Sequence, residues 1–378
     1  MKGKILTLFL LVFFLHSNAQ KSTEEDIYNK SRHYTEFKPI DTSKILSFTA
    51  FGVNINEVKN FTPFKTAYHY TPYQDSIFRT HSMPLNDIKT EGINNFFIIK
   101  QEENNLYKAI IYFDGKYNDY TDEQGIWIAV YNKKEKSLKK YYTGLSQNAP
   151  LHIKWDSKFS LIKNDTVLQI EASLVQKISN MVIPGTPAGY KLVKDGLLIE
   201  FDLKKIALDS DNDGLTDIEE TKMILNPYSS DTDNDGIPDK IDANPRFNLP
   251  RTDRTIIYEA IIDNITNNLL CDSLFSKFNG SINDSAKTYL IISNNADIQA
   301  VKKINKRVII LTEEEYKTAK EKYYNPLSRF YFSPLFKIDE TENTYKMYVS
   351  PMAGSMQTFI IKKTAKGWEI KMSSFSIA

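Results

Sequence analysis

Cysteine is almost absent from this chain of 378 residues: Cys271 is the only one, so no internal disulfide can form. It lies on an apolar helical pattern, which favours a buried, unreactive thiol over a catalytic nucleophile. Histidine is scarce too, and the histidines after the first twenty residues are far apart: His33, His69, His81 and His152. A serine-hydrolase elbow, a zinc-binding His-Glu-x-x-His pair and a glycine-rich phosphate loop are all missing. The sequence therefore carries no signature of catalysis.

Long apolar runs and clustered positive charge are missing after the first twenty residues. No later segment approaches the roughly 20 apolar residues that cross a bilayer as a helix. The formal net charge is +1 and the basic residues are spread thinly, which argues against nucleic acid as a partner. Charged residues make up 25% and hydrophobic residues 41%, as in ordinary folded proteins. We expect a folded protein with no transmembrane span once its first segment is removed.

The first segment, residues 1–19, is typical of a signal peptide. It has a basic start, an apolar run from Ile5 to Leu15 and small residues just before Gln20, where we expect the mature chain to begin. The run is too short for a permanent membrane anchor, and no cysteine follows it, which excludes a bacterial lipoprotein. We therefore expect an exported protein, located in the periplasm, at the cell surface or outside the cell.

The length of the mature chain predicts a multidomain fold, because single cores stop growing at about 250–300 residues. Residues 20–95 are polar and irregular, and we expect a lead-in that packs on the domain after it. β-branched and aromatic runs between turn residues then predict strands at Phe96–Ile99, Tyr107–Phe113, Ile126–Tyr131, Leu138–Leu145, Leu151–Ile162, Thr166–Lys177 and Tyr190–Leu203. Residues 96–203 should form a mainly antiparallel β domain, either a sandwich or a barrel-like sheet.

The last third, residues 251–378, mixes helical and strand patterns and predicts an α+β domain. Helical spacing covers Asp253–Phe278, Asp297–Ile304 and Thr312–Tyr323, the last beginning with a Thr312/Glu315 capping box. Strand patterns cover Tyr289–Ser293, Val308–Leu311, Phe330–Ile338, Thr344–Val349, Met356–Lys362 and Trp368–Met372. The final strands should form an antiparallel meander.

Between these two predicted domains, residues 204–250 contain an acidic segment. From Asp209 to Asp242 there are eleven Asp or Glu residues against two Lys. The first loop of this segment places acids on alternate residues of a tight turn, as calcium coordination by six to eight oxygens requires. Its candidate ligands are Asp209, Asp211, Asp213, the Leu215 carbonyl, Asp217 directly or through water, and Glu220 as the closing bidentate carboxylate.

The same register repeats 22 residues later, counted from Asp209 to Asp231. The second set of candidate ligands is Asp231, Asp233, Asp235, the Ile237 carbonyl, Asp239 and Asp242. Asp242 is one carbon shorter than Glu220, which predicts a weaker second site. An acidic solvated linker would place its acids at arbitrary offsets, whereas both copies share seven positions.

The loops do not follow the helix–loop–helix pattern of an EF-hand, because Leu197–Leu208 has a strand pattern and the eighth loop positions are Thr216 and Pro238. Thr216 and Glu219 nevertheless predict a short capped helix from Asp217 to Ile224. Residues 209–245 resemble a pair of thrombospondin type 3 repeats in their bacterial, cysteine-free form. The resemblance implies calcium bound in an elongated segment that joins neighbouring domains, commonly in secreted or cell-surface proteins.

Three hypotheses follow. In the first, the protein is an exported binding or cell-envelope structural protein in which calcium stiffens the junction between two domains. In the second, it is a secreted hydrolase whose catalytic acids, with His152 as one candidate partner, lie in a flanking domain. In the third, calcium switches the binding of a partner. A protein or glycan partner is open, since Tyr68-His69-Tyr70 and Tyr141-Tyr142 could line a sugar-binding face, although packing in a core or on a sheet explains them better.

Overall fold

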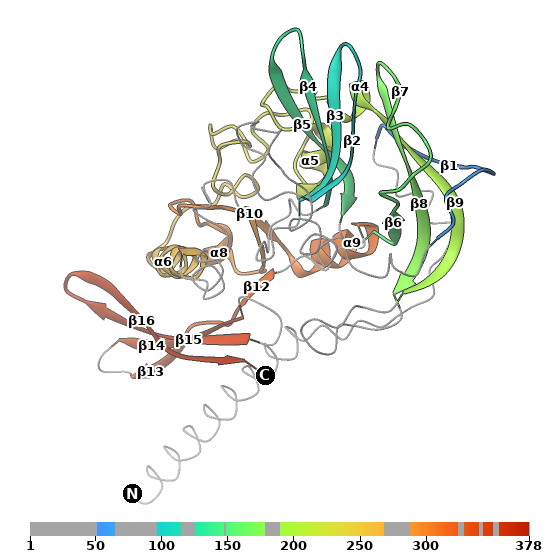
Figure 1. Cartoon of the computed structure of the whole chain (residues 1–378). Coiled ribbons are helices and arrows are strands. Elements are labelled where there is room, and N and C mark those ends of the chain that lie inside the picture. The colour runs from blue at the N-terminus through green and yellow to red at the C-terminus, as the bar shows by residue number, and fades with distance from the viewer. Residues whose placement is uncertain are drawn as a thin grey trace, which may run out of the picture.

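A computed structural model describes most of the chain after residue 50. The described residues are 51–64, 97–114, 125–146, 149–177, 190–267, 288–323, 329–339, 343–350 and 355–377. The predicted signal peptide, Cys271, His33, His69, His81 and the Tyr68–Tyr70 cluster lie outside them. Figure 1 shows curved sheets at the top right, the acidic segment in yellow beside them, and a further sheet towards the C-terminus.

Two antiparallel sheets form the first part of the fold. The five-stranded sheet has the order β1-β9-β8-β6, with β7 also paired to β8. Its strands are β1 (Val53–Glu57), β6 (Leu151–Ile153), β7 (Ile162–Asn164), β8 (Val167–Lys177) and β9 (Tyr190–Asp202). The four-stranded sheet is a meander of β2 (Phe97–Glu103), β3 (Tyr107–Asp114), β4 (Gly125–Asn132) and β5 (Ser137–Ser146). We call this pair the N-terminal sheets.

One hydrophobic core joins the N-terminal sheets. Ile111 and Ile128 of the four-stranded sheet and Ile170 and Ile199 of the five-stranded sheet belong to one buried cluster, and each is 0% exposed. The alternation of inward and outward residues along each strand produces this shared apolar layer. Tyr142 is also buried in this core, beside Trp127, so packing explains it and a sugar-binding role does not.

The C-terminal sheet has seven strands and is mixed. Its order is β11-β10-β12-β14-β15-β16, with β13 paired to β14; β10 runs parallel to β11 and β12, and the other pairs are antiparallel. The strands are β10 (Thr288–Ile292), β11 (Arg307–Leu311), β12 (Arg329–Phe332), β13 (Phe336–Asp339), β14 (Thr344–Ser350), β15 (Ser355–Thr364) and β16 (Gly367–Ile377). The predicted meander is thus confirmed for β14–β16.

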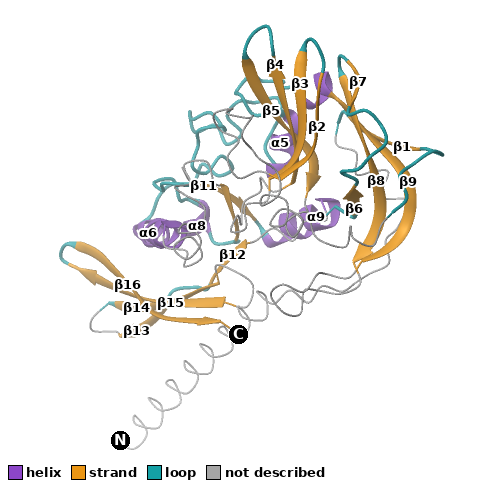
Figure 2. Cartoon of the chain, viewed as in Figure 1, coloured by secondary structure: helices purple, strands orange, loops and turns teal. Residues whose placement is uncertain are grey.

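Helices cover both faces of this sheet at β10. Tyr289 and Ile291 face a core that includes Ile257 and Ile261, whereas Leu290 and Ile292 face a second cluster on the opposite side. This alternation follows from the two-residue period of a strand. The helices here are α6 (Asp253–Asn267), α8 (Ala296–Gln299) and α9 (Glu313–Tyr323). Two others adjoin the first acidic loop: α4 (Leu203–Ile206) precedes it, and α5 (Asp217–Met223) begins at its ninth residue. Figure 2 shows the second half of the acidic segment as loops between these elements.

The predicted mainly β character with several antiparallel sheets is confirmed. Some element boundaries were wrong. Leu151–Ile162 is not one strand, because turns follow β6 after Ile153 and the next strand, β7, begins only at Ile162. Phe330–Ile338 is broken around Pro334, which has no backbone N–H to donate. Strand β1 was not expected in the lead-in, and a helical turn, α4, precedes the first loop where a strand was predicted.

The helix predicted at Asp297–Ile304 also ends early, at Gln299. Side chains from other parts of the fold form hydrogen bonds with backbone N–H and C=O groups that would pair with each other in a longer helix. The Asn244 amide donates to the carbonyls of Gln299 and Val301, and Glu259 Oε1 accepts from the backbone N–H groups of Lys302 and Lys303. Tertiary contacts therefore override the local helical pattern.

Candidate metal centre formed by two acidic loops

The first acidic loop brings three carboxylates to one point. Asp209, Asp211 and Asp213 each offer an oxygen, and these oxygens lie within 4.8 Å of one another. Backbone turns produce this convergence: Asn212 and Gly214 have positive φ angles of 62° and 95°, which asparagine and glycine tolerate best. The chain therefore curls around the space between the carboxylates.

Backbone hydrogen bonds hold one carboxylate oxygen of Asp209 and one of Asp211, and leave the second oxygen of each without a hydrogen bond in the described part of the chain. Gly214 N–H donates to Asp209 Oδ2 at 3.0 Å, and Asp213 N–H donates to Asp211 Oδ1 at 3.1 Å. The second oxygens, Asp209 Oδ1 and Asp211 Oδ2, are buried and have no hydrogen-bond partner among the described residues. Buried oxygens without a partner are costly, and a bound cation would satisfy them.

The second loop reproduces this geometry. Oxygens of Asp231, Asp233 and Asp235 again lie within 4.8 Å of one another. Gly236 N–H donates to Asp231 Oδ2 at 2.8 Å, and Asn234 and Gly236 have positive φ angles of 58° and 93°. The same sequence register has thus produced the same turn twice.

The ninth residue of each loop, Asp217 or Asp239, accepts hydrogen bonds from the second residue of the same loop and is not one of the three clustered aspartates. Asp217 accepts hydrogen bonds from the backbone N–H and the hydroxyl of Ser210, both at 2.8 Å. Asp239 accepts the equivalent pair from Thr232, at 2.9 and 2.6 Å. The hydroxyl residue at the second loop position was not considered in the sequence prediction, although its repetition in both copies was a visible signal. Coordination of a metal by Asp217 and Asp239 stays a prediction.

The closing carboxylates are buried. Glu220 is 0% exposed, and neither of its oxygens has a hydrogen-bond partner within the described part of the chain. Asp242 is 3% exposed, with Oδ1 accepting from Asn244 N–H at 2.9 Å and Oδ2 buried and unpartnered in the same residues. A fully buried carboxylate with two unsatisfied oxygens is rare in folded proteins without a counter-ion.

Electrostatics in both loops favour a cation. Burial raises the pKa of Glu220 to about 9, and the charges of Asp211 and Asp213 add to the shift. Burial likewise raises the pKa of Asp233 to about 6, with Asp235 and Asp242 contributing. Both shifts mean that the ionised carboxylates are disfavoured in the absence of positive charge.

The first loop is joined to both parts of the fold through α5. The predicted capping box is confirmed: Thr216 accepts from Glu219 N–H, and the Glu219 side chain accepts from Thr216 N–H. Along this helix, Ile218 belongs to the core of the N-terminal sheets. Met223, with Leu225 just after the helix, belongs to the cluster on the C-terminal sheet that also contains Leu290. A helix of seven residues thus contacts both cores and carries Glu220 between them.

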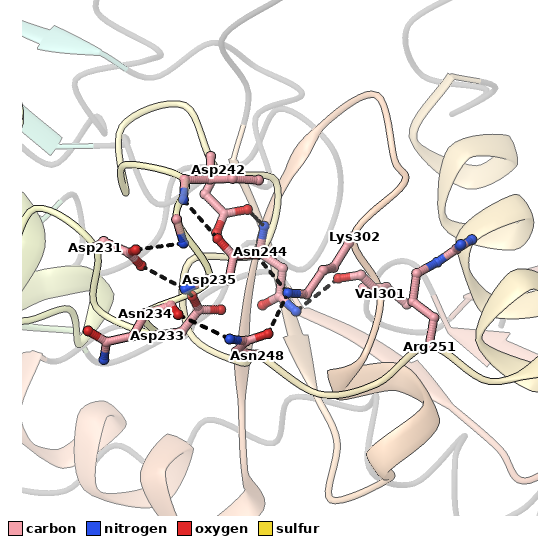
Figure 3. A network of polar contacts seen from close by, with 12 residues as sticks. Asp231, Asp233, Asn234, Asp235, Asp242, Asn244, Asn248, Arg251, Val301 and Lys302 are labelled. Atoms are coloured by element: carbon pink, nitrogen blue, oxygen red, sulfur yellow. Dashed lines mark hydrogen bonds and ion pairs between the residues drawn. The ribbon is translucent and has the colours of Figure 1, made fainter.

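Two lysines link the acidic loops to later segments of the chain. Lys240 of the second loop donates from its backbone N–H to Asp213 Oδ2 at 3.1 Å and from its ammonium to the Gly214 carbonyl at 2.8 Å. Lys302, which follows α8, donates from its ammonium to Asp235 Oδ2 at 2.7 Å (Figure 3). No local pattern could have indicated the second contact, because its two residues are 67 positions apart.

A second cluster of acids bears on the hydrolase hypothesis. Asp195 pairs with the buried Lys154 ammonium and also accepts from Ser173 and from the Phe64 N–H. Glu171 accepts from the N–H and hydroxyl of Thr62 and from the Lys158 N–H. These hydrogen bonds tie the segment around Thr62 to the sheet. His152 packs edge-on against Phe64. These contacts form a polar network that links distant segments of the fold, and the hydrolase stays a hypothesis.

Comparison with known proteins adds no relative: no family model, no curated protein and no solved structure matches the chain. The interpretation of the loops therefore rests on their own sequence and geometry. Within the described residues, no helix combines the length and the apolar character that a membrane span requires.

Proposed function

We propose that this is an exported calcium-binding protein in which calcium fills two acidic loops and holds the N-terminal sheets and the C-terminal sheet together. The role of the metal is structural. The protein acts at the cell envelope or outside the cell, in binding or in structural support. The N-terminal signal-peptide pattern and the resemblance of residues 209–245 to thrombospondin type 3 repeats support this proposal.

The observation that carries the proposal is Glu220. Its carboxylate is fully buried beside the Asp209, Asp211 and Asp213 cluster, and both of its oxygens are unpartnered within the residues described. It lies on the helix that contacts both cores. A cation at this point would neutralise the carboxylates and stabilise the packing of α5 against both sheets at once.

The donor set indicates which metal is bound. Every candidate side chain offers carboxylate oxygen, which suits hard cations such as calcium and magnesium rather than zinc or copper. A loop closed by a bidentate glutamate, with a backbone carbonyl at the seventh position, offers the larger and more flexible shell that calcium takes. Calcium sites of extracellular modules have dissociation constants of about 0.1–1 mM, and we expect affinities near this range.

Calorimetric titration tests the proposal. Calcium chloride is added to the chelator-treated mature protein and to an Asp211→Ala/Asp233→Ala variant. Two saturable events in the wild type, both lost in the variant, are expected, together with a calcium-dependent rise in melting temperature that the variant lacks. A Glu135→Ala/Asp165→Ala variant, which removes two exposed acids elsewhere, should behave like the wild type. Absence of saturable binding to the wild type would overturn the proposal, and magnesium chloride should bind more weakly than calcium.

A further inference from the structure

The aspartate at the fifth position of each loop, Asp213 or Asp235, accepts hydrogen bonds both from its own loop and from a later segment of the chain. Asp213 and Asp235 both use Oδ1 for a backbone N–H of their own loop, from Leu215 at 2.6 Å and from Ile237 at 2.9 Å. Their Oδ2 atoms differ. Asp213 Oδ2 accepts a neutral backbone N–H from Lys240, whereas Asp235 Oδ2 accepts a charged ammonium. The ion pair between Lys302 and Asp235 thus places a full positive charge on a candidate ligand of the second loop.

The Lys302 ammonium is held in place from several sides. The Lys302 side chain is 23% exposed and that of Asp235 is 5% exposed, so their ion pair is largely shielded from water. The backbone N–H of Lys302 donates to Glu259, which is itself paired with Arg251. The ammonium also donates to Asn248 Oδ1 at 2.9 Å, and the Asn248 amide donates to the Asn234 carbonyl of the loop (Figure 3).

We propose that Lys302 is an internal competitor for calcium at the second loop. The inference rests on the proposed function and adds the regulation of one site. In the metal-free protein the ammonium neutralises part of the Asp231, Asp233, Asp235 and Asp242 cluster. Calcium that binds Asp235 through Oδ1 would share this carboxylate with the Lys302 ammonium on Oδ2, and the two cations would repel each other. The first loop therefore fills at lower calcium, and the second fills only as the hold of Lys302 on Asp235 weakens.

The competition couples the second loop to the C-terminal sheet. Residues 299–303 receive hydrogen bonds from Asn244, whose N–H donates to the candidate ligand Asp242. Lys302 belongs to the same segment. Filling of the second loop thus changes the contact between the loop and this segment, whereas the first loop is joined to the sheets by apolar packing.

Two methionine variants of the full mature protein test the proposal. Lys302→Met removes the competing charge and keeps the length of the apolar stem. Lys303→Met removes the same charge from the exposed neighbouring residue. In calorimetric titrations with calcium chloride, Lys302→Met should tighten the weaker of the two sites by roughly tenfold and leave the tighter site unchanged. Lys303→Met should change neither site by more than about twofold.

A loop-specific background identifies the site that responds. Asp233→Ala disables the second loop, and in that background Lys302→Met should have no effect on the remaining site. In an Asp211→Ala background, which disables the first loop, the tenfold gain should persist. If Lys302→Met proves unstable, as judged by its circular dichroism and melting curve in chelator, Lys302→Gln keeps a polar donor to Asn248 and removes the same charge.

Several outcomes would overturn the inference: no change on Lys302→Met or Lys302→Gln, equal effects of the Lys302 and Lys303 variants, or tightening that persists in Asp233→Ala. Each leaves the proposed function intact, provided that the wild type binds two calcium ions. Failure of the wild type to bind calcium would instead remove the proposed function itself.

Discussion

The two acidic loops share one sequence register but connect to their surroundings in different ways. The seventh residue of the first loop, Leu215, is 6% exposed and packs in the cluster on the C-terminal sheet, whereas its counterpart Ile237 is 40% exposed. The first loop continues into a helix that carries the closing Glu220. The second loop has Pro238 at the equivalent helix-capping position and is followed by turns.

This difference teaches that the backbone turn of a loop and its contacts with the rest of the fold are separable. The backbone turns and the ring of aspartates are the same in both copies because local hydrogen bonds determine them. What each loop transmits depends on its contacts outside that ring. The first loop is followed by a helix with apolar contacts to two cores, and the second loop is linked to a distant segment by the Lys302–Asp235 ion pair.

The largest difference in stability between the loops should appear when the seventh residue of each, Leu215 or Ile237, is replaced by alanine. Leu215→Ala should lower the free energy of unfolding by about 2–4 kcal/mol, because it leaves a cavity in a buried cluster. Ile237→Ala should cost less than about 1 kcal/mol, because the side chain is substantially exposed. Urea denaturation in chelator measures both variants without the metal contribution. Equal losses would contradict the difference in coupling between the two loops.

The closing carboxylates should differ in their effect on calcium binding. Glu220→Gln should weaken the first site by about a hundredfold, equivalent to about 2.7 kcal/mol, because it removes a charged bidentate ligand. Asp242→Asn should weaken the second site by about tenfold, since we expect the Lys302–Asp235 ion pair to make that site the weaker one. Titration calorimetry of each single variant reports the site that is lost. A larger loss for Asp242→Asn would reverse the predicted order of the two sites.

The paired glycines offer a finer comparison. Gly214 and Gly236 have nearly the same positive φ, so alanine at either position should cost about 1–2 kcal/mol of stability. A Cβ at Gly214 would also collide with the Lys240 ammonium, whereas a Cβ at Gly236 meets nothing within 4 Å. The lysine can swing away, but it then loses its hydrogen bond to the Gly214 carbonyl, so Gly214→Ala should be the more damaging by about 0.5–1 kcal/mol in thermal denaturation. If the two variants melt alike, the Lys240 contact contributes little to joining the loops.

A further comparison concerns a contact that does not depend on calcium. Arg246, just after the second loop, hydrogen-bonds Glu315 of α9 and holds the pKa of Glu315 at about 2. Because the folded pKa lies below the ordinary value of 4.5, this pair stabilises the fold above about pH 4.5, and the contribution is lost as the pH falls towards 2. The Glu315 side chain is 35% exposed, so solvent weakens the ion pair, and we expect the free energy of unfolding to fall by about 1 kcal/mol.

Chemical denaturation of the chelated protein at pH 7, 4 and 3 measures this loss. Arg246→Gln should flatten the difference between pH 7 and pH 3. Lys317→Gln, which removes an exposed charge from the same helix, should leave it unchanged. An unaltered pH profile for Arg246→Gln would show that the pair contributes nothing measurable to the join.

Much of the local structure could be predicted from residue patterns. Runs of β-branched residues indicated most strands of the N-terminal sheets, and Thr216 with Glu219 indicated the start of α5. The predicted length of an element was wrong where a side chain distant in the sequence hydrogen-bonds to the backbone. The short α8 is the clearest example, because Asn244 and Glu259 satisfy the groups that would have extended it.

The sequence by itself determined the two acidic turns, since the spacing of aspartate, asparagine and glycine sets local hydrogen bonds that form within a few residues. The tertiary structure decided which carboxylates are buried, that α5 contacts two cores, and that an ammonium from 67 residues away pairs with Asp235. The physical reason is that burial and ion pairing depend on which distant segments pack together, and no local pattern encodes that packing.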